Sequence, residues 1–384
     1  MRFPEFSGEW VTKSINDLAV VIGGGTPDTT VKSYWDGEIQ WFTPSEIGKN
    51  KYVDSSLRTI TEVGLNNSSA KLLPPNTILL SSRATIGECS LSLRECATNQ
   101  GFQCLVSKKC NVDFLYYLIQ TKKKDLIRKS CGSTFLEISA NEVRKIQVSV
   151  PSDVEQQKIA ELLSLIDERI ATQNKIIEKL QSLIKGLSQQ LLSSENDWIL
   201  YRLDDLAQIK SGYSGTQVSY QTPYKVSRIE TISKHCIDIQ RIGYVECIPE
   251  SYRLNVGNIL FSNINSIQYI GNTAYLDKDY GLYHGMNLLR IIPNTTIVRP
   301  RFLHLLLCTD WAINHFQTIC NKAVSQASIN QTALGKSRFP IPPMSVQQQI
   351  CSMFELTERK LDNEQEYISC LQQQKRYLLQ KMFI

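Results

Sequence analysis

The chain repeats itself once, and this duplication constrains its fold more than any other feature of the sequence. At an offset of 188 residues, Asp17–Ala19 matches Asp205–Ala207. Beyond the middle of each half the offset becomes 191, so that Pro151 matches Pro342. The period is close to half of the 384 residues, whereas solenoids repeat roughly every 20 to 50 residues. The sequence therefore predicts two copies of one domain-sized unit.

Between these matched edges the two halves diverge. The stretch TPDTTVKSYWDGEIQWFTPSEIG in the first half has no counterpart in SYQTPYKVSRIETISKHCIDIQ in the second. Matched edges around unmatched interiors indicate one scaffold that presents two different surfaces. Simple drift after an old duplication is the alternative explanation, and the sequence leaves it open.

Each repeat ends in a long segment with a heptad pattern. Apolar residues, interrupted only by Gln173, recur at alternating spacings of four and three from Ile159 to Leu191, and the same phase continues 191 residues later from Ile350 to Met382. This spacing is typical of helices that pack along a seam. A proline precedes each segment, as expected just before a helix start. The second seam has three polar interruptions: Thr357, Glu364 and Lys375.

The order of the segments along the chain predicts how the two helices run. The first helix leads into the second globular module and the second helix leads out of it, so the helices are antiparallel if both ends stay near that module. Forty residues at 1.5 Å each correspond to a spacer of about 60 Å. We expect an α+β protein with two similar globular modules, separated by two long helices that form an antiparallel coiled coil with pseudo-two-fold symmetry.

The repeat and the heptad pattern together divide the chain into four expected segments. Within each globular module, short apolar runs bounded by turn residues predict strands at Thr77–Ser81 and Asn258–Ser262, and longer periodic runs predict helices at Asp113–Lys129 and Arg301–Ile319. The expected segments are a first module (1–152), a first spacer helix (153–196), a second module (197–344) and a second spacer helix (345–384).

The eleven cysteines do not form a recognisable disulfide or metal pattern. Their number is odd, and no Cys-x-x-Cys pair occurs. The N-terminal residues lack the apolar core of a secretory signal, and no run approaches the ~18 apolar residues that a membrane helix needs. We therefore expect reduced thiols, no membrane association and a cytoplasmic location.

Catalytic signatures are absent from the sequence. There is no phosphate-binding loop of the form G-x-x-x-x-G-K-[ST] and no G-x-S-x-G elbow. Gly23–Gly25 precedes Thr-Pro-Asp without a lysine, so a turn is the better interpretation. His304 and Cys308 share a helix face without an acidic or thiol companion nearby in the sequence, which favours packing over metal binding. The sequence predicts a chain without an active site.

Positive charge is concentrated on the modules. The net charge is +5, and residues 1–152 carry 18 basic and 15 acidic side chains, while 197–344 carry 14 and 10. The densest basic cluster is Lys122–Lys124 in the first module. Such a cluster is often only a solvated helix face, but on a net-basic module it favours contact with phosphates.

Polar, glycine-punctuated loops surround this cluster and recur in the second module. Arginine pairs with guanine, and asparagine or glutamine with adenine, in the major groove of DNA. Ordinary surface turns use the same residue types, so each loop alone is weak support. The candidate DNA-contacting residues are Lys32, Tyr34, Arg83, Asn99, Gln100, Lys122, Lys123, Lys124, Ser133, Thr134, Asn263, Asn265, His284, Ser325 and Gln326.

Two segments resemble a known family. GSTFLEISANEVRKIQVSVPSDVEQQKIAELLSLIDERI looks like the segment that closes a target recognition domain in specificity subunits of type I restriction–modification systems, and AVSQASINQTALGKSRFPIPPMSVQQQI looks like its second copy. The duplicated Pro-x(4)-Gln-Gln-x-Ile element is the most specific part. The second copy has Val346 where the first has Glu155, and we expect the loss of this acid from the helix start to matter little.

The resemblance implies a non-enzymatic reader of double-stranded DNA. Each target recognition domain would read one half of a bipartite, asymmetric site, and the coiled coil would set the gap and dock two modification (methyltransferase) subunits. Restriction (endonuclease and translocase) subunits would complete the assembly. This chain would carry no cofactor, since S-adenosylmethionine, ATP and magnesium are expected on the partner subunits. Two alternatives stay open: an enzyme with an unrecognised active site, and a coiled-coil scaffold without a nucleic-acid role.

Overall fold

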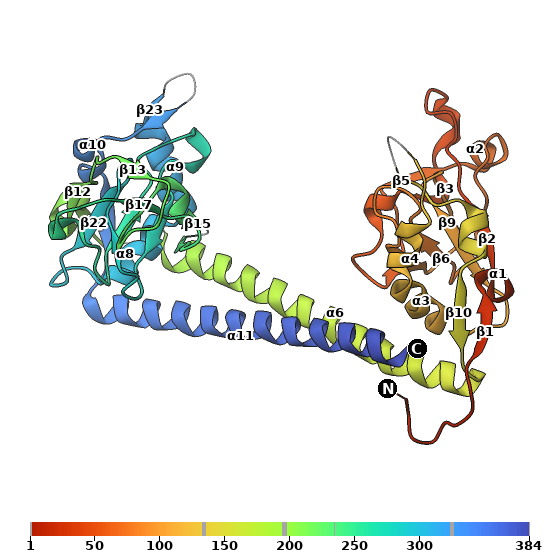
Figure 1. Ribbon diagram of the computed structural model, residues 1–384. Coiled ribbons are helices and arrows are strands. Elements are labelled where there is room, and N and C mark those ends of the chain that lie inside the picture. Colours follow the sequence, from red (N-terminus) through yellow and green to blue (C-terminus); the bar gives the residue numbers. More distant parts are fainter. Residues whose placement is uncertain (1, 133–135, 194–197, 234, 323–325, 384) are drawn as a thin grey trace. The chain divides into compact units, whose positions relative to one another are not determined.

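The computed structural model divides into two compact units. One unit comprises Met1–Ile176 with Glu364–Ile384, and the other comprises Ile177–Asn363. Each unit holds one globular module and a part of both long helices (Figure 1). The structure describes residues 2–132, 136–193, 198–233, 235–322 and 326–383.

The first module is built on a five-stranded sheet with the strand order β2-β9-β6-β7-β4. Neighbours in this sheet are antiparallel except for β7 and β4, which run parallel. The central strand is completely buried, as its apolar sequence Ile-Leu-Leu requires. The strands are β2 (Ala19–Gly23), β4 (Tyr52–Val53), β6 (Ile78–Leu80), β7 (Cys89–Ser92) and β9 (Gln103–Ser107).

The second module repeats this frame with a four-stranded antiparallel sheet in the order β12-β22-β18-β20. The strands β6 and β18 lie within the two segments predicted as strands, so both predictions are confirmed. The four strands are β12 (Ala207–Ser211), β18 (Ile259–Phe261), β20 (Thr273–Tyr275) and β22 (Leu289–Pro293).

The modules differ in the small sheets attached to this frame. The first module adds a three-stranded sheet, β5-β3-β8, and the second adds a four-stranded sheet, β13-β17-β14-β21. Of these strands, β3 and β14 lie within the two stretches without a counterpart, 26–48 and 219–240. Their strands are β3 (Trp35–Phe42), β5 (Arg58–Ile60), β8 (Cys96–Thr98), β13 (Gln217–Val218), β14 (Tyr224–Val226), β17 (Gly243–Val245) and β21 (Leu282–Tyr283).

Each module is closed by a two-stranded antiparallel ribbon next to its long helix, and the second module also has a two-stranded ribbon, β15-β16, and a three-stranded sheet, β19-β24-β23. The order is β1-β10 in the first module and β11-β25 in the second. The last strand of each ribbon leads through a proline into the long helix. The remaining strands are β1 (Val11–Ser14), β10 (Gln147–Val150), β11 (Ile199–Arg202), β15 (Ile232–Ser233), β16 (Cys236–Ile237), β19 (Ile264–Asn265), β23 (Asn321–Lys322), β24 (Ala327–Ser328) and β25 (Arg338–Ile341).

The sequence predicts one continuous helix at Asp113–Lys129 and another at Arg301–Ile319. Their continuity is predicted wrongly, because each segment forms two helices. In the second module, Thr309 is extended and its hydroxyl accepts the Ala312 N–H, which starts a new helix after the first has ended. Apolar periodicity alone cannot reveal such a break. The helices are α3 (Val112–Thr121), α4 (Lys123–Arg128), α8 (Pro300–Leu307) and α9 (Asp310–Ile319).

Short helices complete the two modules. α1 and α7 each precede the first strand of the main sheet, and α5 and α10 each precede the last strand of the module. The same elements thus occur in the same order in both modules, as the duplication predicts. They are α1 (Ile15–Leu18), α2 (Glu62–Asn66), α5 (Ala140–Arg144), α7 (Leu203–Leu206) and α10 (Gln331–Gly335), with 3-10 turns η1 (Lys32–Tyr34), η2 (Pro44–Glu46), η3 (Ile229–Thr231), η4 (Glu250–Tyr252) and η5 (Ile267–Tyr269).

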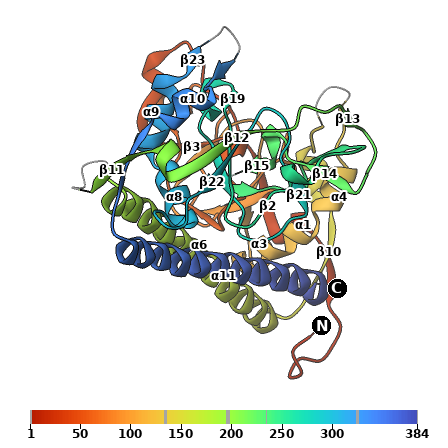
Figure 2. The ribbon, with the colours of Figure 1, turned by 90° about the vertical axis from the view of Figure 1, so that its left-hand side faces the viewer.

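The two long helices are α6 (Asp153–Leu191) and α11 (Met344–Met382), and they pair in antiparallel orientation. In the first unit the beginning of α6 packs against the end of α11, with Ile159 in the same buried cluster as Met382 (Figures 1 and 2). In the second unit the end of α6, including Leu187, packs against the beginning of α11. The predicted antiparallel coiled coil is confirmed within each unit.

A buried glutamine attaches each module to its long helix. Gln156 and Gln347 are the first glutamines of the duplicated Pro-x(4)-Gln-Gln-x-Ile element, and both are buried. The side-chain oxygen of Gln156 accepts the Asn111 N–H (3.1 Å), and that of Gln347 accepts the Arg299 N–H (2.8 Å). These N–H groups precede α3 and α8, so each glutamine satisfies a donor at a helix start that would otherwise lack a partner. The element therefore attaches each module to its long helix, and we call this attachment the joint.

Glu155 has a role that the sequence did not reveal. Its carboxylate is buried and binds the Arg2 guanidinium through two hydrogen bonds of 2.7 Å. The sequence predicts for this acid only a small effect on the helix start. In the second module Val346 takes its place and packs against the apolar core, so the ion pair is replaced by an apolar contact.

The cysteines are free thiols, and several belong to the cores. Burial raises the pKa of Cys96 and Cys104 to about 12, so these thiols are protonated at neutral pH. In the described part of the chain, no helix combines the length and the apolar character needed to cross a membrane.

Candidate nucleic-acid interface

Three loops that are distant in the sequence meet in the first module. Ser82 follows β6, and its N–H donates to the carbonyl of Gly101 in the loop before β9 (2.8 Å). The Ile138 N–H donates in turn to the carbonyl of Ser82 (3.1 Å). The structure therefore brings together the loops that carry the predicted residues Arg83, Asn99 and Gln100, with the segment that leads to Ile138 beside them.

The second module forms the same junction with different residues. Asn263 follows β18 as Ser82 follows β6, and its carbonyl accepts the Ile329 N–H (2.8 Å). The Asn263 side-chain amide donates back to the carbonyl of Ile329 (3.3 Å). The loop after the central strand thus lies against the segment before the last helix in both modules.

Two equivalent glycines allow a close approach at this junction. A Cβ on Gly24 would lie 1.9 Å from the carbonyl oxygen of Asn99, and a Cβ on Gly212 would lie 1.8 Å from that of Gly285. Both distances are far inside van der Waals contact, so only glycine fits. Gly24 therefore packs one loop against another, which agrees with the interpretation of Gly23–Gly25 as a turn.

The predicted residues of the first module are only partly available to a ligand. Arg83 forms an ion pair with Glu137 (2.7 Å), and the Asn99 side-chain oxygen accepts the Gly101 N–H (2.8 Å). Gln100 and Lys32 are exposed. Tyr34 is half-buried in η1 and packs against the apolar cluster of the small sheet rather than at the junction. Ser133 and Thr134 lie outside the described residues.

The lysine cluster lies where α3 gives way to α4, and its members differ. Lys122 is the residue between the two helices, and Lys124 is exposed. Lys123 forms an ion pair with Glu88, and its side chain packs over Gly87. Among the described residues, neither Lys122 nor Lys124 has an ion-pair partner. These two lysines are the better candidates for a phosphate contact.

The two candidate asparagines of the second module, Asn263 and Asn265, are half-buried. The Asn265 side chain donates to the Ser262 hydroxyl (3.2 Å) and accepts the Ser266 N–H (2.8 Å), so it shapes the loop itself. Gln326 is exposed at the opposite side of the junction, on the segment before β24. Ser325 lies outside the described residues.

His284 lies inside the second module and not on its surface. Its side chain is 1% exposed, and its Nε2 is 3.0 Å from the carbonyl of Leu288. Burial lowers the pKa of His284 to about 4, so the ring is neutral at pH 7 and its Nε2 donates to the carbonyl. The prediction that this side chain faces DNA does not fit its position in the fold.

The junction contains a buried oxygen without a partner in each module. Among the described residues, Ser82 Oγ and Asn263 Oδ1 have no hydrogen-bond partner, and they occupy equivalent positions after β6 and β18. An unsatisfied buried oxygen costs roughly 1–3 kcal/mol. A donor from a ligand, or from a rearranged loop, would therefore stabilise both junctions in the same way.

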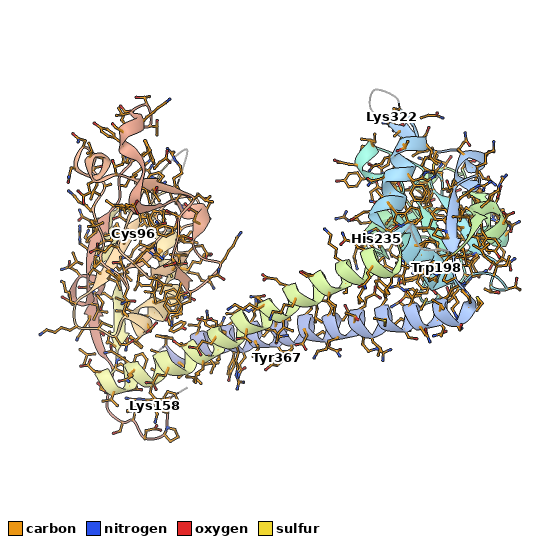
Figure 3. The ribbon with its side chains drawn as sticks, turned by 180° about the vertical axis from the view of Figure 1, so that it is seen from behind. Cys96, Lys158, Trp198, His235, Lys322 and Tyr367 are labelled. Carbon is orange, nitrogen blue, oxygen red and sulfur yellow. The ribbon has the colours of Figure 1, made fainter. Side chains whose placement is uncertain are left out.

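A cluster around Cys308 joins residues that the sequence separates widely. Its sulfur lies 3.4 Å from His304 Nε2 and 3.3 Å from Nδ1 of His235, which is labelled in Figure 3. Arg301 donates to His304 Nδ1 (3.0 Å), so the neutral ring carries its proton on Nε2. His304 also stacks on Tyr275, in keeping with a packing role. The described residues contain no group of three potential ligands arranged to hold a metal ion.

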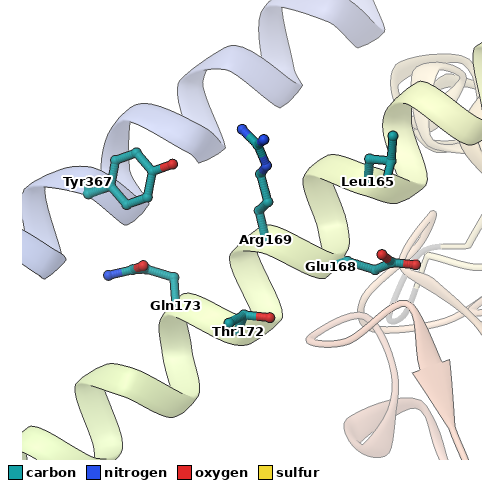
Figure 4. A pocket seen from close by; sticks show the side chains of 6 residues that line it. All are labelled: Leu165, Glu168, Arg169, Thr172, Gln173 and Tyr367. Carbon is teal, nitrogen blue, oxygen red and sulfur yellow. The ribbon is translucent and has the colours of Figure 1, made fainter.

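A shallow pocket of about 350 Å³ lies on the helix pair of the first unit. Figure 4 shows Arg169 extending from α6 toward α11, and the ring of Tyr367 reaching from α11 into the same space. Leu165 on its rim is 58% exposed, and its equivalent in the second repeat, Leu356, is 64% exposed. The lining residues are Leu165, Glu168, Arg169, Thr172, Gln173 and Tyr367.

Comparison with known proteins identifies the family. The model of the type I restriction modification DNA specificity domain matches residues 7–182 and again 195–373. The MjaIX specificity subunit from Methanocaldococcus jannaschii is 30% identical over 327 residues, which are 72% of this chain and 75% of that protein. The EcoR124I/EcoR124II specificity subunit from Escherichia coli is 28% identical over 210 residues, covering 53% and 49% of the two chains.

Solved structures share the fold. The S subunit of a type I restriction–modification system from M. genitalium superposes with a TM-score of 0.60 at 16% identity, over 100% of this chain and 99% of that one. A chain from a structural study of assembly in the type I system gives a TM-score of 0.61 at 13% identity, over 98% of both chains. Because the family model matches both halves and most of the chain, the protein belongs to the family of type I restriction–modification DNA specificity subunits.

Proposed function

We propose that each module of this DNA specificity subunit reads one half of a bipartite, asymmetric site on double-stranded DNA. The observation that carries this proposal is the junction of loops after the central strand of each module. The two junctions share one backbone contact, to the carbonyl of Ser82 in one module and of Asn263 in the other, but present different side chains. One scaffold with two different polar surfaces suits a reader of two different half-sites.

The charge of the modules supports contact with the phosphate backbone. Residues 1–152 have a net charge of +3 and residues 197–344 of +4, whereas the first spacer segment, 153–196, carries 5 basic and 7 acidic side chains. Lys124, which is exposed, and Lys122, which is half-buried, contribute positive charge to the first module. Phosphate contacts orient a protein on DNA, while base contacts select the sequence. We assign the lysines to the first task and Gln100 and Gln326 to the second.

The spacer helices serve as the docking surface for two modification subunits. The support for two copies is the repeat itself, because Leu165 and Leu356 are large apolar residues exposed at equivalent positions of the two helices. Two equivalent surfaces suit two copies of one partner. Restriction subunits join the same assembly. The helix pair also sets the gap between the half-sites.

This chain itself is non-catalytic in our proposal. Its polar clusters are used in loop structure and packing, as the contacts of Asn265 and His304 illustrate. S-adenosylmethionine, ATP and magnesium act on the partner subunits, and methylation and cleavage occur there. The assembly works on DNA in the cytoplasm, where thiols such as Cys131, which is exposed, stay reduced.

Methylome sequencing of a host that expresses this chain with its partner subunits tests the proposal. We expect one modified motif made of two short half-sites, separated by a fixed number of unread bases, and no modification without this chain. A modified but continuous motif would contradict the assignment of one half-site to each module. Methylation or cleavage by the purified chain alone would favour an enzyme, and failure to bind any duplex with its partners present would favour a scaffold.

A further inference from the structure

Each module contacts its long helix through polar groups at two levels. The first level is the buried glutamine of the joint, Gln156 in α6 and Gln347 in α11. The second level is a carboxylate further along the helix. The hydroxyl of Tyr117 in α3 donates to Asp167 Oδ2 (2.7 Å), and the guanidinium of Arg301 in α8 donates to Glu358.

The two levels lie on one face of the helix. Asp167 follows Gln156 by 11 residues, and Glu358 follows Gln347 by the same 11. Eleven residues at 3.6 per turn make three turns with about 20° left over, and they span roughly 16 Å along the axis. Two contacts this far apart on one face fix the tilt of the module on its helix, which a single contact cannot do.

The two carboxylates occupy the same position in the repeat, but their partners differ. Asp167 and Glu358 are 191 residues apart, so they are equivalent. Tyr117 corresponds to Leu305 in the second module, while Arg301 corresponds to Asp113 in the first. The side chains that bind the two carboxylates therefore extend from different turns of the equivalent helices α3 and α8. Both contacts use a carboxylate of the long helix, whereas the partner residue from the module differs.

Both contacts are reinforced by a further polar partner, and the first is the better shielded from water, because the Glu358 side chain is 37% exposed. The Asp167 side chain is 14% exposed and also binds Lys375 of α11 (2.7 Å), so the first contact ties the module to both long helices. Arg301 is 19% exposed and also donates to His304 (3.0 Å). Charge-assisted bonds in such surroundings are stronger than exposed ion pairs.

We propose that Asp167 and Glu358 are positioning residues that fix the tilt of each module on its spacer helix, and thereby restrict the gap between the two half-sites. This inference rests on the proposed function. The tilt determines where each module meets the duplex, while the bases that it selects depend on its loops. Loss of either carboxylate therefore relaxes the gap and leaves both half-sites unchanged.

The experiment measures methylation of a plasmid library in which the two half-sites are separated by gaps of every length. The variants are Asp167→Asn, Tyr117→Phe and Glu358→Gln, each assembled with the partner subunits. We expect the preference for the best gap over gaps one base pair shorter or longer to fall about tenfold, the effect of losing one charge-assisted bond. The half-site sequences stay the same.

Matched controls separate this effect from general damage. Glu178→Gln and Glu366→Gln remove exposed carboxylates elsewhere on α6 and α11, and both should keep the wild-type gap profile. Tyr117→Phe keeps the packing of the ring, so it decides the first module if Asp167→Asn does not fold. An unchanged gap profile in folded Tyr117→Phe and Glu358→Gln overturns the inference while the proposed function stands. A change in the half-site sequences also overturns it. The absence of any bipartite motif with the wild-type chain would instead refute the proposed function.

Discussion

Gln173 of α6 and Glu364 of α11 hold the same position in the two repeats, and they bind each other. The Gln173 side-chain amide donates to the Glu364 carboxylate and lies 3.3 Å from its backbone carbonyl. Gln173 is 5% exposed, so the contact is a buried polar layer in the seam. Equivalent residues of an antiparallel pair meet only where a local two-fold axis passes between them. A buried polar pair of this kind favours one register of the helices.

This relationship predicts a coupling between the two side chains. Gln173→Ala and Glu364→Ala should each lower the free energy of unfolding, and a double-mutant cycle should give a coupling of about 1.5–3 kcal/mol, the value for a hydrogen bond to a charged group. Urea unfolding of the four proteins measures it. Additive effects of the two substitutions would show that the contact does not contribute.

Replacement of both residues by leucine should have the opposite effect on stability. Gln173→Leu with Glu364→Leu makes this layer of the seam apolar, and the exchange of a buried polar pair for apolar side chains is often stabilising. The single change Gln173→Leu leaves the Glu364 carboxylate without this donor and should lower the melting temperature. If the double variant melts below the single one, the seam cannot accept an apolar layer here.

The lysine cluster should act through phosphates, and unequally. Replacing Lys122 and Lys124 with Ala should weaken binding to all duplexes and reduce the log–log salt dependence by about 0.9 per lost contact. Lys123→Ala should change the slope less, because this lysine is held by Glu88. Fluorescence titrations at several salt concentrations provide the measurement. An unchanged slope in the Lys122/Lys124 variant would mean that these side chains are only solvated.

The buried His284 should make the second module sensitive to acid. Burial holds its folded-state pKa at about 4, below the ordinary value of 6.5, so the unfolded chain binds the proton first as the pH falls. The stability that this histidine contributes is therefore present above pH 6.5 and lost as the pH falls toward 4. At pH 5 the loss is about 2 kcal/mol relative to pH 7.

A variant isolates this contribution from that of the carboxylates. His284→Gln keeps a donor near the Leu288 carbonyl but does not titrate. The difference in unfolding free energy between pH 7 and pH 5, measured in urea, should be smaller in this variant than in the wild type. Equal pH dependence in the two proteins would show that His284 is not protonated on unfolding in this range.

The exposed leucines of the spacer helices should control the number of bound modification subunits. Leu165→Glu or Leu356→Glu places a charge on one of the two equivalent surfaces, so each variant should bind one subunit where the wild type binds two. Native mass spectrometry counts the subunits. Lys175→Glu is the control, because this exposed position is polar in both repeats. Two bound subunits in both leucine variants would place the docking surface elsewhere.

The sequence predicted the parts of the fold that depend on periodicity and repetition. The heptads from Ile159 and Ile350 identified the helix pair, and the short apolar runs identified β6 and β18. The breaks inside the predicted module helices were missed, because they depend on local contacts such as that of Thr309 with the Ala312 N–H. Periodicity does not report these contacts.

The candidate site was predicted less completely, since burial and long-range contacts are not visible in a sequence. The pattern His284-Gly285 reads as a polar turn, yet the ring points inward. His235 lies beside Cys308 across 73 positions, and nothing in the local pattern relates them. The contacts of Asp167 and Glu358 could not be predicted from the sequence, because they depend on where α3 and α8 lie against the long helices.

The central claim is that each module reads its half-site independently, and exchange of one module tests it most directly. A chimera that carries residues 20–138 from another family member, with Asn111 and Tyr117 retained, keeps the ribbon, the contacts of Gln156 and Asp167 and both long helices of this chain. Methylome sequencing of a host with this chimera and the partner subunits should show one new half-site, with the other half-site and the gap unchanged. A change in both half-sites, or in neither, would contradict the account.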